Sequence, residues 1–525
     1  MRAGMLAVIL TTALGATSAG QEITEFITVR DGRFVDAAGR HVILHGINVG
    51  QKHDPYVSWH RPEDYARMRE WGFNCVRLLT LWAAIEPECG TYDEEYLKRL
   101  DARIAWAKEH GLYVLLDMHQ DLWGEKPRGD GAPAWATLDE GKPRGPKGAV
   151  WSDAYFTSPM IQTAFDNFYA NTPGPDGVGI QDRFALAWQH LAKRYANEPA
   201  IVGYDLINEP FMGSEILLAP IRLAPRLARL MAEEEGTSGA WGLVALYEKL
   251  RTVEGRIEVM KKLADIELYR SLTDAVAPVS MAFEKDKLAP MYQRVAKAIR
   301  EVDARHIVFI EPNPSTNAGI RSDLGPVPGP DGQPDPLQAL APHAYDIFVD
   351  TPASAQASGP RIRLILARHH EHAQQVGLPM LLGEWGAFYN SPEALGAAQK
   401  FVTEIERTLM SDTYWSSQKN LEKTSYFIML ARPCPVAVSG IILSYRTDFE
   451  TRRFECTWRE DPTVKEPSRF YVSDLWYPHG FVVEVSPPNA RHSTERASPN
   501  GAARYVVVPL VGRDLERRVA VLPKP

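Results

Sequence analysis

The chain has 525 residues, of which 45% are hydrophobic and 24% charged, and its formal net charge is −8. This length predicts either one large barrel with an appended domain or two to three domains. The composition is that of a globular protein and excludes a disordered chain. The acidic balance argues against a nucleic-acid-binding protein, because such proteins need clustered Lys and Arg in excess.

The N-terminal segment has the layout of a secretory signal peptide. Arg2 precedes an apolar run over residues 5–14, and small residues follow up to Gly20. We therefore expect residues 1–20 to be removed and the mature protein to be secreted or periplasmic. No later stretch approaches the roughly 20 uninterrupted apolar residues of a membrane span, so we expect a mature protein that is not embedded in a bilayer.

Eight short apolar segments recur between residues 41 and 417 and alternate with helical stretches. They read HVILHGINVG, NCVRLLTLW, YVLLDMHQD, IVGYDLINEP, HIVFIEPNP, QALAPHAYD, PMLLGEWG and TYWSSQ. Near-continuous apolar strands that alternate with helices indicate a parallel sheet buried on both faces. Eight such units predict a (β/α)8 TIM barrel over residues 21–430. A doubly wound sheet would need a glycine-rich phosphate loop after its first strand, and HGINVGQK lacks that spacing.

Residues 213–290 are mostly helical and form an insertion longer than a usual βα connection, on the face where barrel enzymes carry their sites. The insertion contains the leucine-rich stretch SEILLAPIRLAPRLARLM. These apolar side chains either pack against each other and the barrel rim, or form a hydrophobic lid or a platform for an aglycone. The second interpretation implies transient contact with a membrane or micelle surface.

Residues 431–525 have a different pattern, with short strands broken by Asp, Gly, Pro and Asn. This pattern predicts a C-terminal antiparallel β-sandwich domain. The domain either packs against the barrel, which we favour, or binds sugar. The platform for sugar binding would be formed by residues that equally suit a core, namely Phe470, Tyr471, Trp476 and Tyr477.

The four cysteines are Cys75, Cys89, Cys434 and Cys456. They are too few for a disulfide framework, and we favour a Cys434–Cys456 pair if the compartment is oxidising. Their spacing matches no zinc site. The sequence implies no metal and no cofactor.

Polar or aromatic side chains stand where the predicted strands end. They are Asn48 and Lys52, Arg77, His119 and Asp121, Asn208 and Glu209, Glu311, His343 and Tyr345, Glu384, and Trp415. Active sites of barrels are built at the carboxyl ends of the strands, so we expect these side chains to converge. Glu311 is followed by Pro312 and has no amide before it, which favours a non-catalytic role.

Glu209 and Glu384 each follow an apolar strand, and neither belongs to a histidine-containing metal pattern. Two acids without a metal indicate glycoside hydrolysis, in which one acid protonates the leaving oxygen and the other attacks the anomeric carbon. Trp123, Trp385 and Trp415 lie next to polar segments of the predicted site, and their flat faces suit stacking on a pyranose ring.

The motifs DMHQD, NEP, HAY and GEWG occur in the order found in glycoside hydrolase family 5. The longer segments LLDMHQDLWG, INEPF, IVFIEP, APHAYD, GEWG, YWS and RPCPVAVSG resemble the endoglycoceramidase group of that family. The resemblance extends from about residue 25 to the C-terminus. It implies a retaining β-glycosidase on a (β/α)8 barrel.

The resemblance implies that Glu209 is the general acid/base, that Glu384 is the nucleophile and that Asn208 binds the sugar 2-hydroxyl. Retention predicts carboxyl groups about 5 to 5.5 Å apart. Arg77 and Tyr345 would keep Glu384 ionised and oriented. The remaining expected substrate-binding residues are His343 beside the acid/base, His119, Asp121, Trp415 and Lys52.

The leading hypothesis is a secreted glycosidase that cleaves the sugar–lipid bond of glycolipids, with a glycolipid or oligosaccharide as its binding partner. Three alternatives remain open. The enzyme could be an endo-β-glucanase or mannanase of the same family, or a β-glucosidase acting on monoglycosylated lipids such as glucosylceramide. A sugar-binding protein on an inactive barrel would require the loss of one acid, whereas both Glu209 and Glu384 are present.

Overall fold

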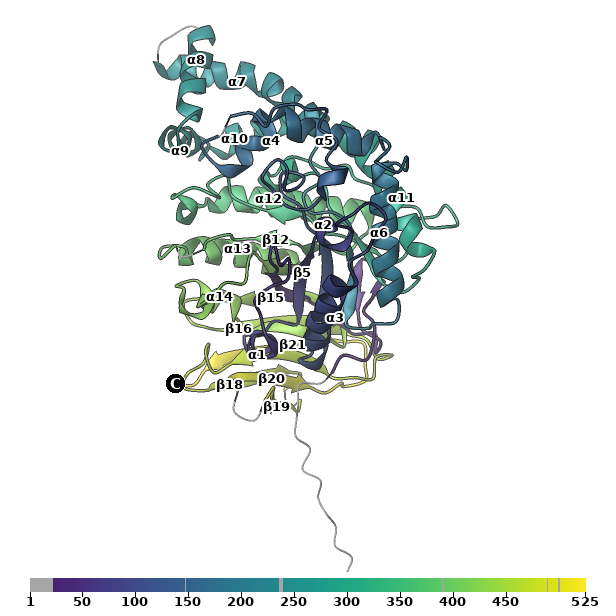
Figure 1. Cartoon of the computed structure of the whole chain (residues 1–525). Helices are drawn as coiled ribbons and strands as arrows, with labels where there is room; N and C mark the ends of the chain where they lie inside the picture. Colours follow the sequence, from purple (N-terminus) through teal and green to yellow (C-terminus); the bar gives the residue numbers. More distant parts are fainter. Residues whose placement is uncertain (1–21, 147, 236–238, 390, 489, 499–500) are drawn as a thin grey trace, which may run out of the picture.

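The computed structural model describes residues 22–146, 148–235, 239–389, 391–488, 490–498 and 501–525 (Figure 1). The predicted signal peptide therefore lies outside the described residues. Within the described part, no helix combines the length and the apolar character needed to cross a membrane.

The centre of the molecule is an eight-stranded parallel sheet, which confirms the predicted TIM-like barrel. The strands are, in sheet order, β11 (Leu381–Leu382), β13 (Ser411–Tyr414), β4 (His45–Val49), β5 (Cys75–Thr80), β6 (Tyr113–Met118), β7 (Ile201–Asp205), β8 (Ile307–Ile310) and β9 (Gln338–Leu340). A parallel bridge between Leu340 and Met380 joins the two ends of this sheet. A second parallel pair, β10 (His343–Ala344) with β12 (Glu384–Trp385), lies just beyond the carboxyl ends of β9 and β11.

Helices surround the barrel and bury one face against it. The larger ones are α1 (Pro62–Glu70), α3 (Glu94–Glu109), α5 (Pro159–Tyr169), α6 (Ile180–Tyr195), α11 (Ala289–Arg300), α12 (Gly359–Val376) and α13 (Leu395–Thr408). Shorter helices, of four residues each, are α2 (Trp82–Ile85), α4 (Ala154–Thr157) and α14 (Phe427–Leu430). In α3 the Asp93 side chain caps the first turn by accepting from the backbone N–H groups of Glu95 and Tyr96. Leu97, Leu100 and Ile104 then recur at helical spacing on its buried face.

The segment between β7 and α11 is the helical insertion. It consists of a short 3-10 helix (Gly213–Leu217), α7 (Leu218–Glu235), α8 (Gly239–Leu250), α9 (Val253–Lys262), α10 (Ile266–Phe283) and a π-helical turn (Glu284–Leu288). Figure 1 shows α7, α8 and α9 at the end of the molecule opposite the C-terminal strands. Each of the two interpretations holds for part of the leucine-rich stretch. Ile216 is buried, as the packing interpretation expects, whereas Leu218 and Ile221 are 49% and 67% exposed.

Two antiparallel sheets form the C-terminal part. One has four strands, β15 (Gly440–Thr447), β16 (Phe454–Glu460), β21 (Glu516–Pro523) and β18 (Phe481–Ser486). The other has seven, β1 (Thr28–Arg30), β2 (Arg33–Val35), β3 (His41–Val42), β14 (Cys434–Val438), β17 (Ser468–Ser473), β20 (Ala503–Val508) and β19 (Ser493–Arg496).

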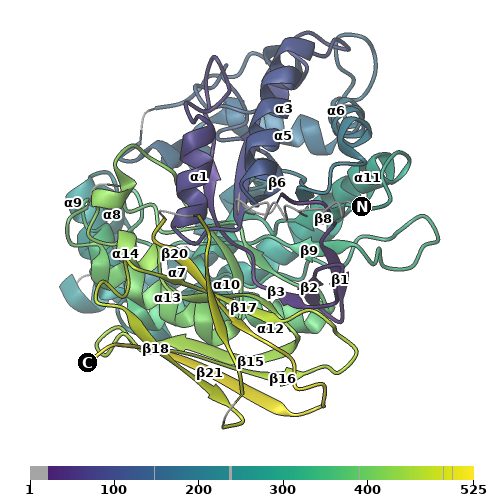
Figure 2. The same ribbon diagram turned by 90° about the horizontal axis from the view of Figure 1, so that it is seen from below.

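The N-terminal strands differ from the expectation that residues 21–430 all belong to the barrel. Strand β3 pairs with β14 through Val42 and Ala437, so β1, β2 and β3 extend a sheet of the C-terminal strands (Figure 2). Strands of two or three residues carry too few positions for hydrophobic periodicity to assign them to one sheet or another.

The C-terminal sheets pack against the barrel helices. Tyr471 donates a 2.9 Å hydrogen bond from its hydroxyl to the carbonyl of Glu70 in α1, and the backbone N–H of Ala503 donates to the Glu70 carboxylate at 2.9 Å. All four aromatic residues of the considered sugar platform are buried, namely Phe470, Tyr471, Trp476 and Tyr477. These side chains therefore belong to the core, as the packing interpretation requires.

The expected disulfide is absent, because all four cysteines are free. Cys434 lies on β14 and Cys456 on β16, so the two belong to different sheets. Both thiols are buried, and burial raises the pKa of the Cys434 thiol to about 12. The sequence offered only spacing as a guide to pairing, and spacing does not determine which strands carry the cysteines.

Candidate active site

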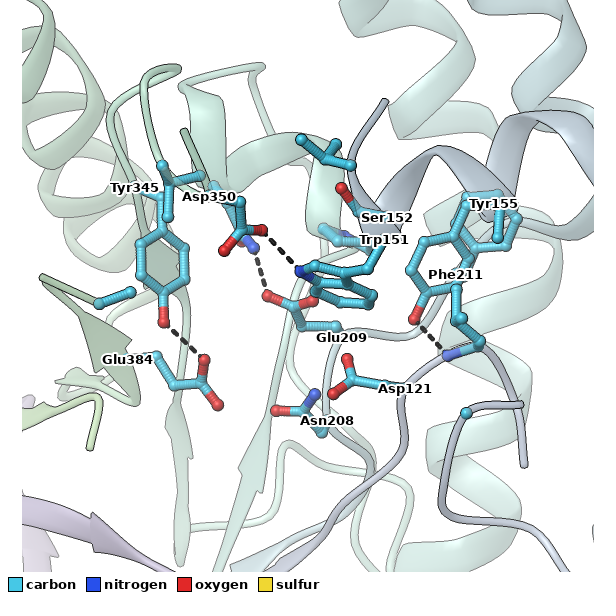
Figure 3. Close-up of a pocket in the computed structure, with 18 of the residues that line it drawn as sticks. Asp121, Trp151, Ser152, Tyr155, Asn208, Glu209, Phe211, Tyr345, Asp350 and Glu384 are labelled. Carbon is cyan, nitrogen blue, oxygen red and sulfur yellow. Dashed lines mark hydrogen bonds between the residues drawn. The ribbon is translucent and has the colours of Figure 1, made fainter. Parts of the chain in front are cut away.

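The carboxyl ends of the barrel strands surround a cavity of about 800 Å³ (Figure 3). Eight of the ten predicted site residues line this cavity, namely Lys52, His119, Asp121, Asn208, Glu209, Tyr345, Glu384 and Trp415. Arg77 and His343 are fully buried and contact the lining residues from within the protein. The strand-end rule therefore brings together residues that are up to 363 positions apart in the sequence, from Lys52 to Trp415.

Glu209 and Glu384 face each other across the base of the cavity. One carboxylate oxygen of each, together with a ring nitrogen of His343, lies within 4.8 Å of the others. Inverting glycosidases separate the two carboxyl groups by about 6.5 to 9.5 Å, whereas retaining enzymes hold them about 5 to 5.5 Å apart. The observed approach therefore has the short spacing of a retaining pair.

Glu384 is held by two donors. Arg77 Nη1 donates to Oε1 at 2.9 Å, and the Tyr345 hydroxyl donates to Oε2 at 2.7 Å (Figure 3). Burial raises the pKa of Glu384, and the positive charges of His343 and Arg77 oppose this rise. Both oxygens of Glu384 are thus fixed in position by donors that favour its carboxylate form.

Arg77 is the centre of a buried cluster of charges. Its guanidinium lies 2.9 Å from Asp205, 2.8 Å from Glu311 and 3.0 Å from Asp117, in addition to Glu384. One cation does not balance four buried carboxylates. Burial and the neighbouring Glu311 raise the pKa of Asp205 well above its ordinary value, which favours its protonated form.

Glu209 lies four residues beyond the end of β7 and lines the cavity, with 15% of its side chain exposed. Asn317 Nδ2 donates to Oε1 at 2.6 Å, and His343 Nδ1 lies 3.0 Å from the same oxygen. The backbone N–H of Glu209 donates to Glu311 Oε2 at 2.8 Å. Sequence reasoning did not identify Asn317, which belongs to a short 3-10 helix (Pro314–Ala318) outside the strand tails.

His343 links the two acids. Its Nδ1 is 3.0 Å from Glu209 Oε1 and 3.5 Å from Glu384 Oε2, while Nε2 is 3.2 Å from Glu311 Oε1. Burial lowers the pKa of His343, but the surrounding carboxylates of Glu311 and Glu384 outweigh burial and raise it well above the ordinary value. The direction of this shift favours the charged imidazolium form of the ring.

Another part of the cavity lining combines charged groups with one aromatic face. His119 stacks on Trp415 with 5.3 Å between the ring centroids, and Lys52 Nζ lies 4.7 Å from the centroid of the same ring. Lys52 also pairs with Asp121. Asp130, which sequence reasoning missed, also lines the cavity, and one of its side-chain oxygens is buried without a hydrogen-bond partner among the described residues. These groups present donors, acceptors and an aromatic face to a polar ligand.

Two of the three tryptophans expected to stack on sugar are core residues. Trp385 is buried and donates from its indole N–H to Asp412 at 2.9 Å, and Trp123 packs against Phe165 and Phe168. Neither lines the cavity, whereas Trp415 does. Adjacency to a motif does not decide orientation, because successive residues at a strand end point in opposite directions.

Trp151 supplies an aromatic face that sequence reasoning missed. It lies in the long loop after β6, and Figure 3 shows its ring beside Glu209. The loop has no hydrophobic periodicity, so its sequence gave no signal for the position of this side chain.

Three groups of carboxylates and histidines are close enough together to hold a cation. A positive side chain of the protein lies within or against each group. Lys52 pairs with Asp121 in the first, the His343 imidazolium belongs to the second, and Arg77 contacts all three carboxylates of the third. A positive charge supplied by the chain itself therefore accompanies each of these groups and offsets part of its negative charge.

Comparisons with known proteins identify the family. The model of cellulase (glycosyl hydrolase family 5) matches residues 35–421, and that of the glycoside hydrolase family 5 C-terminal domain matches residues 432–506. Endoglycoceramidase I of Rhodococcus hoagii (strain 103S) is 26% identical over 489 residues, covering 89% of this chain and 85% of that protein. A glucosylceramidase of Aspergillus fumigatus is 33% identical over 183 residues, or 28% of this chain and 24% of that protein.

Solved structures of endo-glycoceramidase II from Rhodococcus sp. are similar over nearly the whole chain. Its lactosyl-enzyme intermediate is 27% identical with a TM-score of 0.70, covering 94% of this chain and 99% of that one. Its ganglioside GM3 complex is 26% identical with a TM-score of 0.71, covering 94% and 100%. Because the cellulase model alone matches most of the chain, the protein is a glycoside hydrolase and belongs to glycoside hydrolase family 5.

Proposed function

We propose that the protein hydrolyses the sugar–lipid β-glycosidic bond of glycolipids with retention of configuration, through a glycosyl-enzyme intermediate. The observation that carries this proposal is the close pair of Glu209 and Glu384, with Glu384 fixed by Arg77 and Tyr345. The lactosyl-enzyme intermediate of the related endo-glycoceramidase II supports the covalent step.

In the first step Glu384 attacks the anomeric carbon while Glu209 donates a proton to the leaving oxygen. Asn317 and His343 both contact Oε1 of Glu209, so we assign the transferred proton to Oε2. In the second step Glu209, now a carboxylate, takes a proton from the water that attacks the glycosyl-enzyme.

Asn208 supports the bound sugar from beside the acid/base. Its Oδ1 accepts from Arg77 Nη2 at 3.0 Å, and its Nδ2 donates to the carbonyl of Gln120 at 3.0 Å. These contacts fix the orientation of the amide at the cavity wall. The role that we propose is a hydrogen bond to the sugar 2-hydroxyl that strengthens in the transition state.

A lipid aglycone is supported by the apolar character of the cavity near the acid/base. Tyr155 and Phe211 pack with ring centroids 4.4 Å apart, and Phe156 and Ile216 continue this apolar lining. The charged groups around Trp415 line the same cavity and are among the residues to which we assign sugar binding. An enzyme for polysaccharides would instead need polar groups and sugar platforms on both sides of the scissile bond.

A monoglycosylated lipid such as glucosylceramide is a second candidate substrate. The similarity to the Aspergillus fumigatus glucosylceramidase favours it, although that similarity spans only part of both chains. We also propose export of the protein, on the basis of the N-terminal sequence layout.

The test is incubation of the purified protein with lactosylceramide in mild detergent, followed by mass spectrometry of the products. Free ceramide and intact lactose are expected, and Glu384→Gln is the inactive control. Cleavage of glucosylceramide without cleavage of lactosylceramide would assign the enzyme to monoglycosylated lipids. Release of galactose alone would mean that the sugar–sugar bond is cleaved and would contradict the sugar–lipid assignment. An enzyme that cleaves aryl β-glycosides but no glycolipid would contradict the lipid assignment and leave the retaining mechanism intact.

A further inference from the structure

The outward face of α8 is apolar. Trp241, Val244 and Tyr247 recur at three-residue spacing and are 67%, 50% and 62% exposed. Residues three apart lie on one side of a helix, so these three side chains form a stripe along α8. On a helix at the surface of a globular domain, the side that faces solvent normally carries charged or polar residues.

The opposite face of α8 is already packed. Leu246 is buried in a small cluster with Val259 of α9, and Leu227 of α7 and Ala245 pack against this cluster. The helix therefore has a defined inner face within the insertion. The exposed stripe lies on the other side of α8. It is therefore separate from the face by which α8 packs into the insertion.

Further apolar side chains are exposed at the beginning of α7. Leu217, Leu218 and Ile221 are 48%, 49% and 67% exposed. Arg222 and Arg226, which follow on α7, are also exposed. Single exposed apolar residues are normal, whereas several in one element indicate an interaction surface. Tryptophan and tyrosine with flanking arginine are the composition of protein segments that lie in a membrane interface.

The insertion adjoins the active site. Ile216, next to Leu217, lines the active-site cavity. A second cavity of about 560 Å³ is lined by Val253 and Glu254 of α9 and shares Trp151 and Asp350 with the active-site cavity. Parts of the insertion, at Ile216 and at the start of α9, thus lie at the two cavities.

A double hydrogen bond fixes this arrangement. Arg256 of α9 donates to both carboxylate oxygens of Asp153, at 2.8 and 3.0 Å, and Asp153 lies in the loop that carries Trp151. The insertion therefore holds a set position relative to the cavity mouth. A surface that binds the insertion would be held beside that mouth.

We propose that the stripe Trp241, Val244 and Tyr247 of α8, with the apolar start of α7, docks on the surface of a lipid bilayer. The aromatic rings would enter the headgroup region, and the exposed arginines of α7 would favour anionic lipids. The docked insertion presents the cavity mouth to glycolipid headgroups at the same surface. The purpose of this docking surface rests on the proposed glycolipid substrate. The exposed apolar side chains that would bind the bilayer do not depend on that substrate.

The test compares two triple variants with the wild-type full chain. The first replaces the stripe by Trp241→Gln, Val244→Gln and Tyr247→Gln, because glutamine is a good helix former. The matched control replaces three similarly exposed apolar residues of the C-terminal strands by Ile441→Thr, Leu443→Thr and Val482→Thr, whose side chains are 41%, 47% and 44% exposed. None of these six residues lines either cavity.

Binding is measured by co-sedimentation with vesicles of phosphatidylcholine and phosphatidylglycerol. Hydrolysis is measured on a soluble aryl β-glycoside and on lactosylceramide in the same vesicles. The stripe variant is expected to lose at least about fivefold in vesicle partitioning and in vesicle hydrolysis while keeping its aryl glycosidase rate. The control variant is expected to match the wild type in all three assays.

Two results would overturn the inference. One is wild-type protein that does not sediment with the vesicles, and the other is a stripe variant that binds as well as the wild type. If glycolipids are not substrates, lactosylceramide in detergent stays intact. The vesicle-binding result then still decides whether the stripe docks on a bilayer.

Discussion

The indole N–H of Trp151 donates a hydrogen bond of 2.7 Å to Oδ2 of Asp350 (Figure 3). This contact joins the loop after β6 to the loop after β10, and both residues line the active-site cavity and the neighbouring cavity. Burial raises the pKa of Asp350, and its backbone φ of 61° lies in the left-handed region. The pair thus forms a bridge between two loops that line the active-site cavity.

Breaking this bridge should weaken the binding of substrates with a large aglycone. Asp350→Ala removes the acceptor, and we expect KM for a glycolipid to rise about 3- to 10-fold, because a partly exposed hydrogen bond to a charged group contributes about 1 kcal/mol. Asp350→Asn keeps an acceptor and is the matched control, with an expected change below about twofold. Steady-state kinetics that show equal losses in both variants would refute the bridge.

Glu384→Gln should abolish turnover and leave substrate binding nearly unchanged. The amide occupies the same volume but does not attack the anomeric carbon, so we expect kcat to fall by at least about 10³-fold. Calorimetric titration with an unreactive glycolipid analogue measures the retained affinity. Substantial residual turnover in a preparation free of wild-type enzyme would point to another nucleophile.

The strands and the main site residues could be predicted because a topological rule connects them. In a barrel, side chains at the carboxyl ends of strands converge whatever their distance in sequence, and this rule brings Glu209 and Glu384 together. Trp151 and Asn317 escaped prediction because they lie in 3-10 helices of three and five residues (Trp151–Asp153 and Pro314–Ala318), which are too short for a period to fix the direction of a side chain. Trp385 has a different cause, because it follows Glu384 on β12 and the alternation of side chains along a strand directs it into the core.

Glu311 shows a different limit. Its chemistry was visible in the sequence, and it does end strand β8, but a pattern does not distinguish a carboxylate that lines a cavity from one buried beneath it. The structure places it beneath, in contact with Arg77, His343 and the backbone of Glu209. Long-range contacts of this kind are set by the packed barrel and not by the local sequence.

Glu209→Ala should impair the hydrolysis of poor leaving groups far more than that of good ones. Sugar–lipid bonds need protonation of the leaving oxygen, whereas an activated nitrophenyl glycoside departs without it. We expect kcat for a glycolipid to fall about 10²- to 10⁴-fold, with a much smaller effect on formation of the intermediate from the aryl substrate. Burst kinetics with the aryl substrate, and rescue of its turnover by azide, provide the measurement. An equal loss on both substrates would contradict the acid/base assignment.

Asp130 should make stability depend on pH. Burial and the Asp121 charge raise the pKa of Asp130 from 3.8 to about 7. A raised carboxyl pKa contributes stability that is complete below about pH 3.8 and is lost as the pH rises through about 7. Asp130→Asn removes this dependence, so the melting temperature of the variant relative to the wild type should be higher at pH 8 than at pH 5.

Asp101→Asn is the control for this experiment. The pKa of Asp101 is lowered, with burial opposed by hydrogen bonds from Arg194 and Tyr195, and Asp101 is not one of the charges that shift the pKa of Asp130. A lowered pKa affects stability only below the unfolded value, so the effect of Asp101→Asn should be the same at pH 5 and pH 8. If both variants show the same pH trend, the titrating group is not Asp130.

Glu311→Gln tests whether the buried carboxylate positions the catalytic acids. Glu311 accepts from Arg77 Nη2 at 2.8 Å and from the backbone N–H of Glu209 at 2.8 Å, and it lies 3.2 Å from His343 Nε2. In the Gln variant an amide NH2 group replaces one carboxylate oxygen. A donor then faces the donors from which that oxygen accepted. We expect kcat to fall about 10- to 100-fold, which corresponds to the loss of one or two charge-assisted hydrogen bonds.

The pH profile separates positioning from a general loss of stability. The Glu311 carboxylate is one of the charges that raise the pKa of His343, so its removal lowers that pKa. If activity requires the His343 imidazolium, the alkaline limb of the kcat profile moves to lower pH in Glu311→Gln. Glu284→Gln is the matched control, since Glu284 is a buried carboxylate that accepts from Asn313 and Ser322 and does not contact either catalytic acid. A purely structural Glu311 would give both variants a lower melting temperature and an unmoved alkaline limb.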